Sequence, residues 1–250
     1  MTTGALIFAC NNEHIDYEAM AEWSAINIQR HLGIPTHIVT DRAPGHNTRH
    51  FSDVGNVSWH NLNRMDAYRL TPWERTLVLD ADYVVASDQL KPLLEVDQDF
   101  LAHRWAYDVT GCNDFTGLNW FGDNCMPMWW ATVMMFRKSQ QAELIFESMQ
   151  MIRDNWNHYC ALYKNSKTTY RNDHALTIAL GIVNGHTVTH PGVPWALASL
   201  TPEHKLTQLD KDRYRVDFVN TEHKSRWIEL RQDFHAMGKQ QLGAIVADPC

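Results

Sequence analysis

The sequence predicts an α/β fold in which a mixed, mostly parallel sheet is flanked by helices. The apolar run GALIFAC (4–10) is the first strand candidate, and THIVTD (36–41) is the second. Between them, residues 16–33 carry apolar side chains at spacings of three and four, which is typical of an amphipathic helix. Two strands joined by a helix of this length usually run parallel, so the sheet is expected to be parallel here.

Capping residues mark both ends of this first helix. Asp16 is expected to be its N-cap, because a short acceptor side chain satisfies the free backbone N–H groups of the first turn. Gly33 is expected to end it, with Pro35 just beyond.

The rest of the chain repeats the same two patterns. We expect further strands over 75–85, 99–105, 130–138, 186–190 and 215–220. We expect helices over 62–72, over part of 88–96, from an N-cap at Ser139 to Trp156, and over 172–181. Residues 106–128 show no period and are expected to form a long loop, which in a compact domain is usually functional.

Composition excludes several classes of protein. The net charge of −7 argues against broad electrostatic binding to nucleic acid or to an anionic membrane. No apolar run approaches the roughly 20 residues that span a bilayer, and MTTGALIFACNN lacks the basic start of a signal peptide. The five cysteines are scattered without a Cys-x-x-Cys pair, so neither a zinc site nor a disulfide framework is indicated. We therefore expect a cytoplasmic protein with one domain over 1–250.

Two carboxylates lie within the apolar run TLVLDADYVV (76–85), at Asp80 and Asp82. Side chains alternate along a strand, so both are expected on one face, with Ala81 pointing away. Two adjacent carboxylates repel each other, and burial makes each charge costly. A shared proton, Arg or Lys partners, or a divalent cation would each compensate. Ligands of parallel α/β sheets bind beyond the carboxyl ends of the strands, where this pair is expected.

Three segments carry a resemblance to a known family. The segment NRMDAYRLTPWERTLVLDAD (63–82) resembles the nucleotide-sugar-dependent glycosyltransferases of GT-A fold, especially the glycogenin and lipopolysaccharide galactosyltransferase group, family 8-like. That group has a basic residue sixteen positions before the first Asp of its Asp-x-Asp motif, which is the place of Arg64. FACNNEHIDY (8–17) resembles its first strand and nucleotide-contacting turn, and FHAMGK (234–239) resembles its His-x-x-Gly segment.

The resemblance implies a GT-A, Rossmann-like fold and a set of roles. Residues 1–100 would form the nucleotide-binding half, and 101–250 the acceptor half with a C-terminal metal- and phosphate-binding segment. Asp80, Asp82 and His235 would hold Mn²⁺ or Mg²⁺ against the donor diphosphate, with Asp80 also on the nucleotide side. The other implied residues are Arg64 and Lys239 as cations near the diphosphate, Gly238 for a close backbone approach, Asn11 and Tyr17 at the base or ribose, and Asp173 near the transferred sugar. Arg64 and Asp173 would act in catalysis.

Simpler structural roles compete with these assignments. Asn172 or Asp173 would serve equally as a helix N-cap, and Arg64 as a solvated helix residue. His235 would then be one of fourteen ordinary histidines. Trp120, Trp129 and Trp130 would be core residues or sugar-stacking surfaces.

The expected activity is therefore metal-dependent hexosyl or pentosyl transfer from a nucleoside-diphosphate sugar, with UDP the expected nucleotide, to a hydroxyl acceptor. The acceptor would be a glycan, a small molecule or a modified nucleobase. One alternative is a glycosyltransferase acting on hydroxymethylated pyrimidines of viral DNA, against which the acidic net charge argues. A second is a sugar-nucleotide nucleotidyltransferase, which normally has a Gly-rich loop after its first strand. A third is a non-catalytic sugar-nucleotide-binding module.

Overall fold

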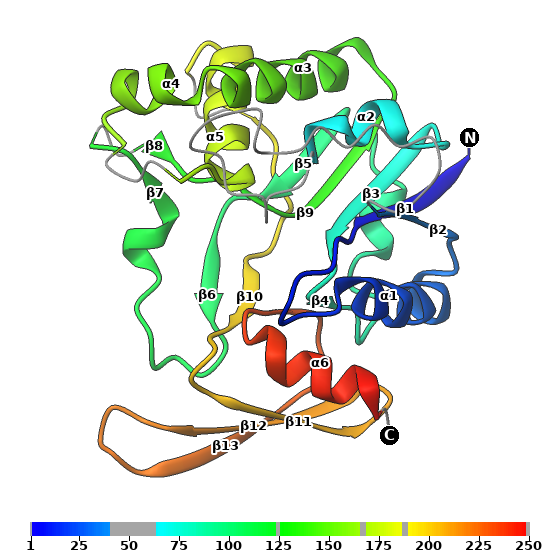
Figure 1. Ribbon diagram of the computed structural model, residues 1–250, viewed down its shortest axis with the longest axis vertical. Coiled ribbons are helices and arrows are strands. Elements are labelled where there is room, and N and C mark those ends of the chain that lie inside the picture. Colours follow the sequence, from blue (N-terminus) through cyan, green and yellow to red (C-terminus); the bar gives the residue numbers. More distant parts are fainter. Residues whose placement is uncertain (1, 41–63, 124–125, 166–168, 187–189, 249–250) are drawn as a thin grey trace.

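The main sheet has five strands in the order β2-β1-β3-β9-β5. The computed structural model describes residues 2–40, 64–123, 126–165, 169–186 and 190–248 (Figure 1). The strands are β1 (Thr3–Phe8), β2 (Thr36–Val39), β3 (Arg75–Asp80), β5 (Phe100–His103) and β9 (Trp130–Arg137). β1 pairs in parallel with β2 and β3, whereas β9 runs antiparallel to β3 and β5. Four strands thus share one direction, which confirms the predicted mixed, mostly parallel α/β sheet.

Helices flank this sheet. Figure 1 shows α1 (Tyr17–Leu32) and α6 (Lys239–Ala247) together on one side, and α3 (Gln140–Asp154), α4 (Trp156–Leu162) and α5 (Asn172–Val183) on the other. Shorter pieces are α2 (Ala67–Leu70) and the 3₁₀ turns η2 (Arg64–Asp66), η3 (Lys91–Leu94) and η4 (Thr116–Asn119). Within the described residues, no helix combines the length and the apolar character needed to cross a membrane.

Three smaller sheets complete the fold. One has the order β4-β14-β10-β6, from β4 (Tyr83–Val84), β14 (Phe234–Ala236), β10 (Leu197–Leu200) and β6 (Ala106–Asp108). An antiparallel sheet contains β11 (Lys205–Asp210), β12 (Arg213–Val219) and β13 (Ser225–Leu230), and a ribbon pairs β7 (Trp120–Phe121) with β8 (Met126–Pro127). The first of these sheets matters most for function, because it brings the C-terminal β14 beside the segment that follows β3.

The predicted helix caps are confirmed. The Asp16 side chain accepts a hydrogen bond from the Ala19 N–H at 3.0 Å. Gly33 ends α1 with φ 73°, a left-handed conformation that glycine adopts without steric cost, and its N–H donates to the Gln29 carbonyl at 3.1 Å. Ser139 caps α3 by accepting from the Ala142 N–H at 3.2 Å.

Several predicted elements are wrong in extent. The strand expected over 75–85 ends at Asp80, and a turn at 81–82 carries the chain into β4 of another sheet. Residues 88–96 form only the single 3₁₀ turn η3. The loop expected over 106–128 contains β6, η4, β7 and β8, because β6 pairs with β10, which lies far along the chain. The strand expected over 186–190 and the start of the helix expected over 62–72 lie outside the described residues.

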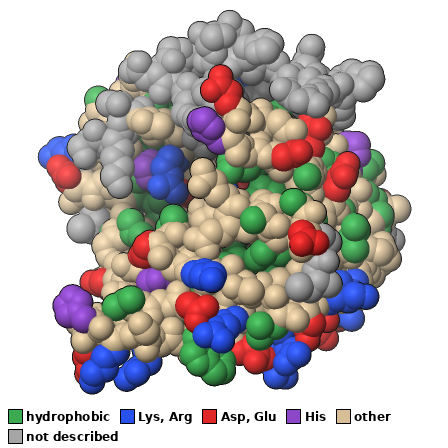
Figure 2. All heavy atoms as spheres, turned by 60° about the horizontal axis from the view of Figure 1, so that its bottom comes forward, with side chains coloured by type: hydrophobic (Ala, Val, Ile, Leu, Met, Phe, Trp, Pro, Cys, Tyr) green, Lys and Arg blue, Asp and Glu red, His purple; other side chains and the backbone are tan. Residues whose placement is uncertain are grey.

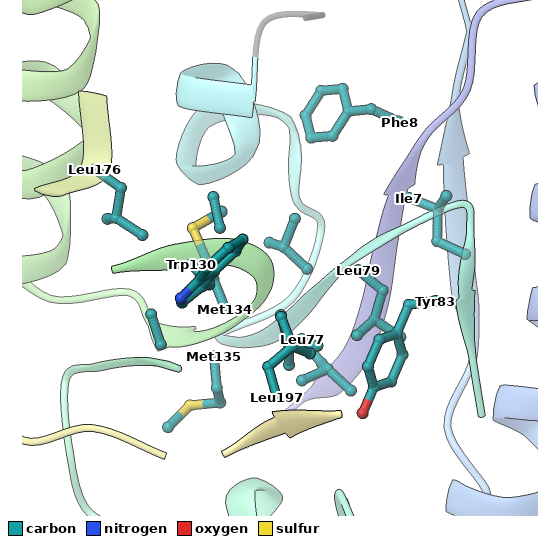
Figure 3. Close-up of a cluster of buried hydrophobic side chains, with 14 of the residues drawn as sticks. Ile7, Phe8, Leu77, Leu79, Tyr83, Trp130, Met134, Met135, Leu176 and Leu197 are labelled. Carbon is teal, nitrogen blue, oxygen red and sulfur yellow. The ribbon is translucent and has the colours of Figure 1, made fainter. Parts of the chain in front are cut away.

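The core forms between the main sheet and its helices. Figure 3 shows side chains from β1, β3 and β9 meeting there, among them Ile7, Leu77, Leu79 and Met134. All four are fully buried. A sheet covered on both faces needs apolar residues at successive positions rather than alternate ones, which explains the continuous apolar runs of these strands.

His103 is a titratable group inside this core. It lies at the end of β5 and is 0% exposed, and neither ring nitrogen has a hydrogen-bond partner among the described residues. Burial lowers the pKa of His103 to about 3. The unfolded chain takes up this proton near pH 6.5, so the unfolded state binds more protons between about pH 6.5 and about pH 3. The contribution of His103 to stability therefore falls as the pH decreases through this window.

Replacing His103 by leucine should remove this acid sensitivity. We expect the free energy of unfolding of His103→Leu, relative to the unsubstituted protein, to rise by about 2 kcal/mol between pH 7 and pH 5. Urea unfolding at both pH values measures this difference. The exposed His158, replaced by glutamine, is the control and should follow the unsubstituted protein. If the free energy of unfolding changed equally with pH in His103→Leu and in the unsubstituted protein, His103 would already be protonated in the folded state.

Candidate active site

Asp80 and Asp82 lie in a cavity of about 220 Å³ at the carboxyl end of β3. Asp80 is the last residue of the strand, and its side chain is 24% exposed. Asp82 is the second residue of the following turn, and its side chain is 5% exposed. A turn rather than continued strand alternation therefore places both carboxylates at the same cavity.

Strand pairing brings His235 to the same place. β14 runs antiparallel to β4, with His235 opposite Tyr83, and the Ala236 N–H donates to the Asp82 carbonyl at 2.9 Å. As a result His235 Nε2 lies 3.5 Å from Asp82 Oδ2. One ligand atom from each of Asp80, Asp82 and His235 lies within 4.8 Å of the others. Residues separated by more than 150 positions thus converge on one point.

Two cations neutralise the carboxylates. Arg64 forms an ion pair with Asp80 through its Nη2 and donates from Nη1 to the Ala131 carbonyl at 2.7 Å. Lys239 donates from Nζ to Asp82 Oδ2 at 2.6 Å. Arg64 is only 7% exposed, so its interpretation as a solvated helix residue is wrong. A shared proton, basic partners or a divalent cation would each compensate such a pair, and in this structure Arg64 and Lys239 are the basic partners.

The two carboxyl groups differ in acidity because their surroundings differ. Burial raises the pKa of Asp80, and the Arg64 charge offsets this only in part. Burial acts in the same direction on Asp82, but the charges of His235 and Lys239 outweigh it and hold the pKa of Asp82 well below its usual range. Burial lowers the pKa of His235, yet the Asp82 carboxylate raises it overall. Asp82 is therefore the firmly ionised member of the pair.

The residues present are suited to a divalent cation. Two carboxylate oxygens and one imidazole nitrogen are a donor set that Mn²⁺ or Mg²⁺ accepts. His235 Nδ1 is buried without a hydrogen-bond partner among the described residues, so this ring is not fully satisfied by the chain. Asp80, Asp82 and His235 thus form a possible metal site.

The remaining predicted residues divide into those at the cavity and those away from it. Tyr17, at the start of α1, lines the cavity, and burial raises the pKa of its hydroxyl while Lys239 lowers it. Asn11 is not among the lining residues, and its Oδ1 instead accepts from the Glu18 N–H at 2.9 Å. Gly238 is also outside the lining and has φ −79°. A Cβ there would meet Pro202 Cα at 3.4 Å, an ordinary contact, so the backbone does not require glycine.

Asp173 connects α5 to β9. Its Oδ1 accepts from the Ala131 N–H at 2.8 Å, and its Oδ2 accepts from Arg171 Nη2 at 2.8 Å. Burial opposes ionisation, but the Arg171 charge and the Ala131 N–H lower the pKa of Asp173 overall. The N-cap interpretation of Asn172 or Asp173 is wrong, because the cap position of α5 is Arg171 and no side chain caps the helix. Asp173 lines the same cavity as the carboxylate pair.

Other lining residues were not foreseen from the sequence. They are Phe8, Cys10, Ala81, Ala131, Thr132, Arg171, Asn172 and Met237. Trp130, which the sequence suggested for core packing or sugar stacking, also lines the cavity. Ala131, Thr132 and Met237 are small or apolar residues of β9 and of the segment after β14, and carry no local chemical signal. Arg171 was detectable in principle, because it directly precedes the polar start of a predicted helix.

Comparisons with known proteins give similarity of structure but not of sequence. No protein-family model matches this chain, and no curated protein matches it. The galactosyltransferase LgtC, solved with donor and acceptor sugar analogs, is 16% identical with a TM-score of 0.46, over 71% of this chain and 70% of LgtC. The glycosyltransferase GlyE of Streptococcus pneumoniae is 14% identical with a TM-score of 0.42, over 77% of this chain and 45% of GlyE.

A third similar structure is a mutant of Drosophila β-1,4-galactosyltransferase 7, solved with manganese, UDP-Gal and xylobiose. It is 9% identical with a TM-score of 0.32, over 94% of each chain. This chain spans less than half of GlyE. All three TM-scores lie below 0.5, so these similarities assign no function, which has to be argued from the site itself.

Proposed function

We infer that the chain is a metal-dependent glycosyltransferase that moves a hexose or pentose from a nucleoside-diphosphate sugar, with UDP the expected nucleotide, to a hydroxyl acceptor. The observation that carries this proposal is the convergence of Asp80, Asp82 and His235 within 4.8 Å. Arg64 and Lys239 contact the same two carboxylates. Such a site suits a ligand that combines a divalent cation with a diphosphate.

The charges of the site balance in a way that supports diphosphate binding. Two aspartates and two basic residues sum to zero, so each cation is held at the cavity by a carboxylate. When bound there, Mn²⁺ or Mg²⁺ supplies Lewis-acid stabilisation of the charge on a leaving diphosphate. If Asp80 and Asp82 are neutralised by a metal ion, Arg64 and Lys239 become free to donate to phosphate oxygens. Such donation would stabilise the transition state electrostatically.

Other residues of the cavity are suited to the sugar and the nucleoside. Among the described lining residues, Asp173 is the carboxylate outside the possible metal site. Its two oxygens hold Ala131 and Arg171, so it positions the start of β9 at the cavity wall. We place it near the transferred sugar. Tyr17, on the opposite flank at the start of α1, and Asn11, in the preceding loop, are placed near the base or ribose. Gly238 leads into Lys239 at the start of α6.

The structure does not favour the alternatives. Figure 2 shows basic and acidic side chains interspersed over the lower part of the face that it presents. Three arginines on the antiparallel sheet or directly after it are paired with carboxylates: Arg213 with Asp210, Arg215 with Asp217 and Arg231 with Glu229. These arginines are therefore not free to follow a DNA backbone. For a nucleotidyltransferase, the segment 9–16 after β1 contains no glycine that could form a triphosphate loop.

A thermal-shift experiment tests the proposed function. With Mn²⁺ present and UDP at about 100 times its Kd, we expect about 2.7 kcal/mol of stabilisation. For a chain of this size that corresponds to a rise in Tm of about 5–10 °C. UDP without metal should produce a much smaller rise, because Arg64 and Lys239 are then held by Asp80 and Asp82 and leave no free cation for the diphosphate.

GDP, CDP and ADP are the matched comparisons, since they share the diphosphate and differ in the base. A preference for UDP would support the assignment of the nucleotide. The proposal fails if no nucleoside diphosphate stabilises the protein with Mn²⁺, or if metal makes no difference. Release of UDP from UDP-sugars then distinguishes an enzyme from a binding module.

A further inference from the structure

A second cavity, of about 300 Å³, borders the first through two consecutive residues. Trp130 lines the possible donor site, whereas its neighbour Trp129 lines the second cavity. Arg104, Trp105 and the segment 192–196 form other parts of the second wall. One short stretch of chain thus separates the two cavities.

Aromatic faces dominate this cavity. The guanidinium carbon of Arg104 lies 4.6 Å from the ring centroid of Trp105 and 5.5 Å from that of Trp129. Trp105 is nonetheless 45% exposed, and its ring meets that of Trp120, which is 42% exposed, at 6.0 Å and 78°. Trp105 in the cavity wall thus remains open to solvent, and the partly exposed Trp120 packs edge to face against it. An electron-rich indole face suits the C–H face of a pyranose ring.

Hydrogen-bond donors accompany these aromatic rings. Arg104 carries five N–H donors, and its Nη1 donates to the Met128 carbonyl at a long 3.4 Å. Among the residues that the structure describes, no carboxylate pairs with Arg104. Trp195 also lines the cavity, and its indole N–H is buried without a partner in the described part of the chain. These unpaired donors favour a ligand rich in oxygen acceptors.

These features favour a saccharide over a nucleic acid. Bases also stack on indoles, but a strand of nucleic acid needs a series of cations along its phosphates. Arg104 is the one Lys or Arg residue that lines this cavity among the described residues. A sugar ring needs an aromatic face and a few donors, which the cavity offers.

Helix α5 connects the second cavity to the first. The Trp129 N–H donates to Thr177 Oγ1 at 2.8 Å, and the Ala131 N–H donates to Asp173 Oδ1 at 2.8 Å. Asp173 and Thr177 are four positions apart, so they lie on one face of α5. This face holds the segment 129–131 at both ends and fixes the position of one cavity relative to the other. We propose that the second cavity, with Trp105 in its wall and Trp120 packed against Trp105, is a binding subsite for the acceptor saccharide. This assignment rests on the proposed glycosyl transfer.

Binding of defined oligosaccharides to the full chain tests the subsite. Isothermal titration would use cellotetraose and maltotetraose as neutral probes, and tetragalacturonate as an acidic probe. We expect at least one of them to bind, and Trp105→Ala to weaken that binding about tenfold or more. A stronger effect of Arg104→Gln on the acidic probe than on the neutral ones would identify a carboxylate-bearing sugar.

Trp227 offers a matched control on β13. It is 57% exposed and stacks with Arg215 at 5.1 Å, as Trp105 stacks with Arg104, but it lines neither cavity. Trp227→Ala should change the Kd less than twofold, and far-UV circular dichroism would verify that both variants fold. The subsite is overturned if no saccharide binds, if Trp105→Ala binds as tightly as the unsubstituted protein, or if oligothymidylate competes in a Trp105-dependent way.

The same titration separates this inference from the proposed function. Asp82→Asn should leave saccharide binding unchanged while it removes metal-dependent nucleotide binding. If the chain bound nucleotides but no saccharide, the proposed subsite would be wrong and the proposed glycosyl transfer would stand. Saccharide binding without any response to nucleotides and metal would overturn glycosyl transfer, and with it the acceptor role, while leaving a saccharide site.

Discussion

Replacing Asp82 by asparagine should lower the rate of sugar transfer by at least about 10²-fold, the scale seen when one preorganised electrostatic group is removed. Asparagine keeps the shape of the side chain but loses its charge. His235 and Lys239, which lie 3.5 Å and 2.6 Å from Asp82 Oδ2, then lose their anionic partner. The possible metal site loses one of its two carboxylates. UDP release from UDP-sugars, measured over a range of Mn²⁺ concentrations, should show both a lower maximum rate and a higher requirement for metal.

Asp99→Asn is the matched control for this experiment. Its side chain is 24% exposed, against 5% for Asp82, and it pairs with Arg137 at 2.5 Å, away from the cavity. This variant should keep its activity. The comparison therefore shows whether the loss in Asp82→Asn comes from the metal site or from removing any paired carboxylate. If Asp82→Asn turned over like the unsubstituted protein, the proposed metal site would be wrong.

Replacing Arg64 by methionine should reduce the free energy of unfolding by about 3 kcal/mol in the absence of metal. Removing one partner of a buried ion pair costs about 3–5 kcal/mol, and the lower value applies because Asp80 is 24% exposed. The loss leaves Asp80 beside Asp82 without a neutralising charge and frees the Ala131 carbonyl. Urea unfolding at pH 7 measures the change.

A double variant and a surface variant make this prediction specific. Arg64→Met combined with Asp80→Asn should recover a large part of the loss, because the unpaired charge is then absent. Arg137→Met removes a partly exposed cation and should cost much less than Arg64→Met. Mn²⁺ should stabilise Arg64→Met more than the unsubstituted protein, because Asp80 then lacks a competing cation. Equal losses in Arg64→Met and the double variant would show that an unpaired Asp80 charge is not what destabilises Arg64→Met.

Elements set by neighbouring residues could be predicted well from the sequence. The caps Asp16, Gly33 and Ser139 are where they were expected, because a cap depends on contacts within four residues. The strands β1, β3 and β9 begin near their predicted positions for a similar reason. Their apolar runs are shorter than a typical buried helix and are typical of strands buried on both faces. The α/β class follows from the order of these elements along the chain.

Elements formed by distant partners could not be predicted in this way. β6 and β10 are short, and they form because each supplies the other with backbone hydrogen bonds across about ninety positions of sequence. The predicted strand 75–85 breaks after Asp80 because Tyr83 and Val84 pair with β14 instead of continuing beside β9. No local pattern carries this information, since the apolar residues would be buried in either arrangement.

The chemical groups of the site can be read from the sequence alone: two carboxylates after an apolar strand, a histidine near the end of the chain, and basic residues at Arg64 and Lys239. Their arrangement depends on the folding of distant segments. Pairing of β14 with β4 places His235 at Asp82, and burial of Arg64 makes it a partner of Asp80 rather than a solvated residue. Only the fold places Trp129 and Trp130 at two separate cavities. The reason is that residue chemistry is local, whereas distance and burial depend on which strands pair.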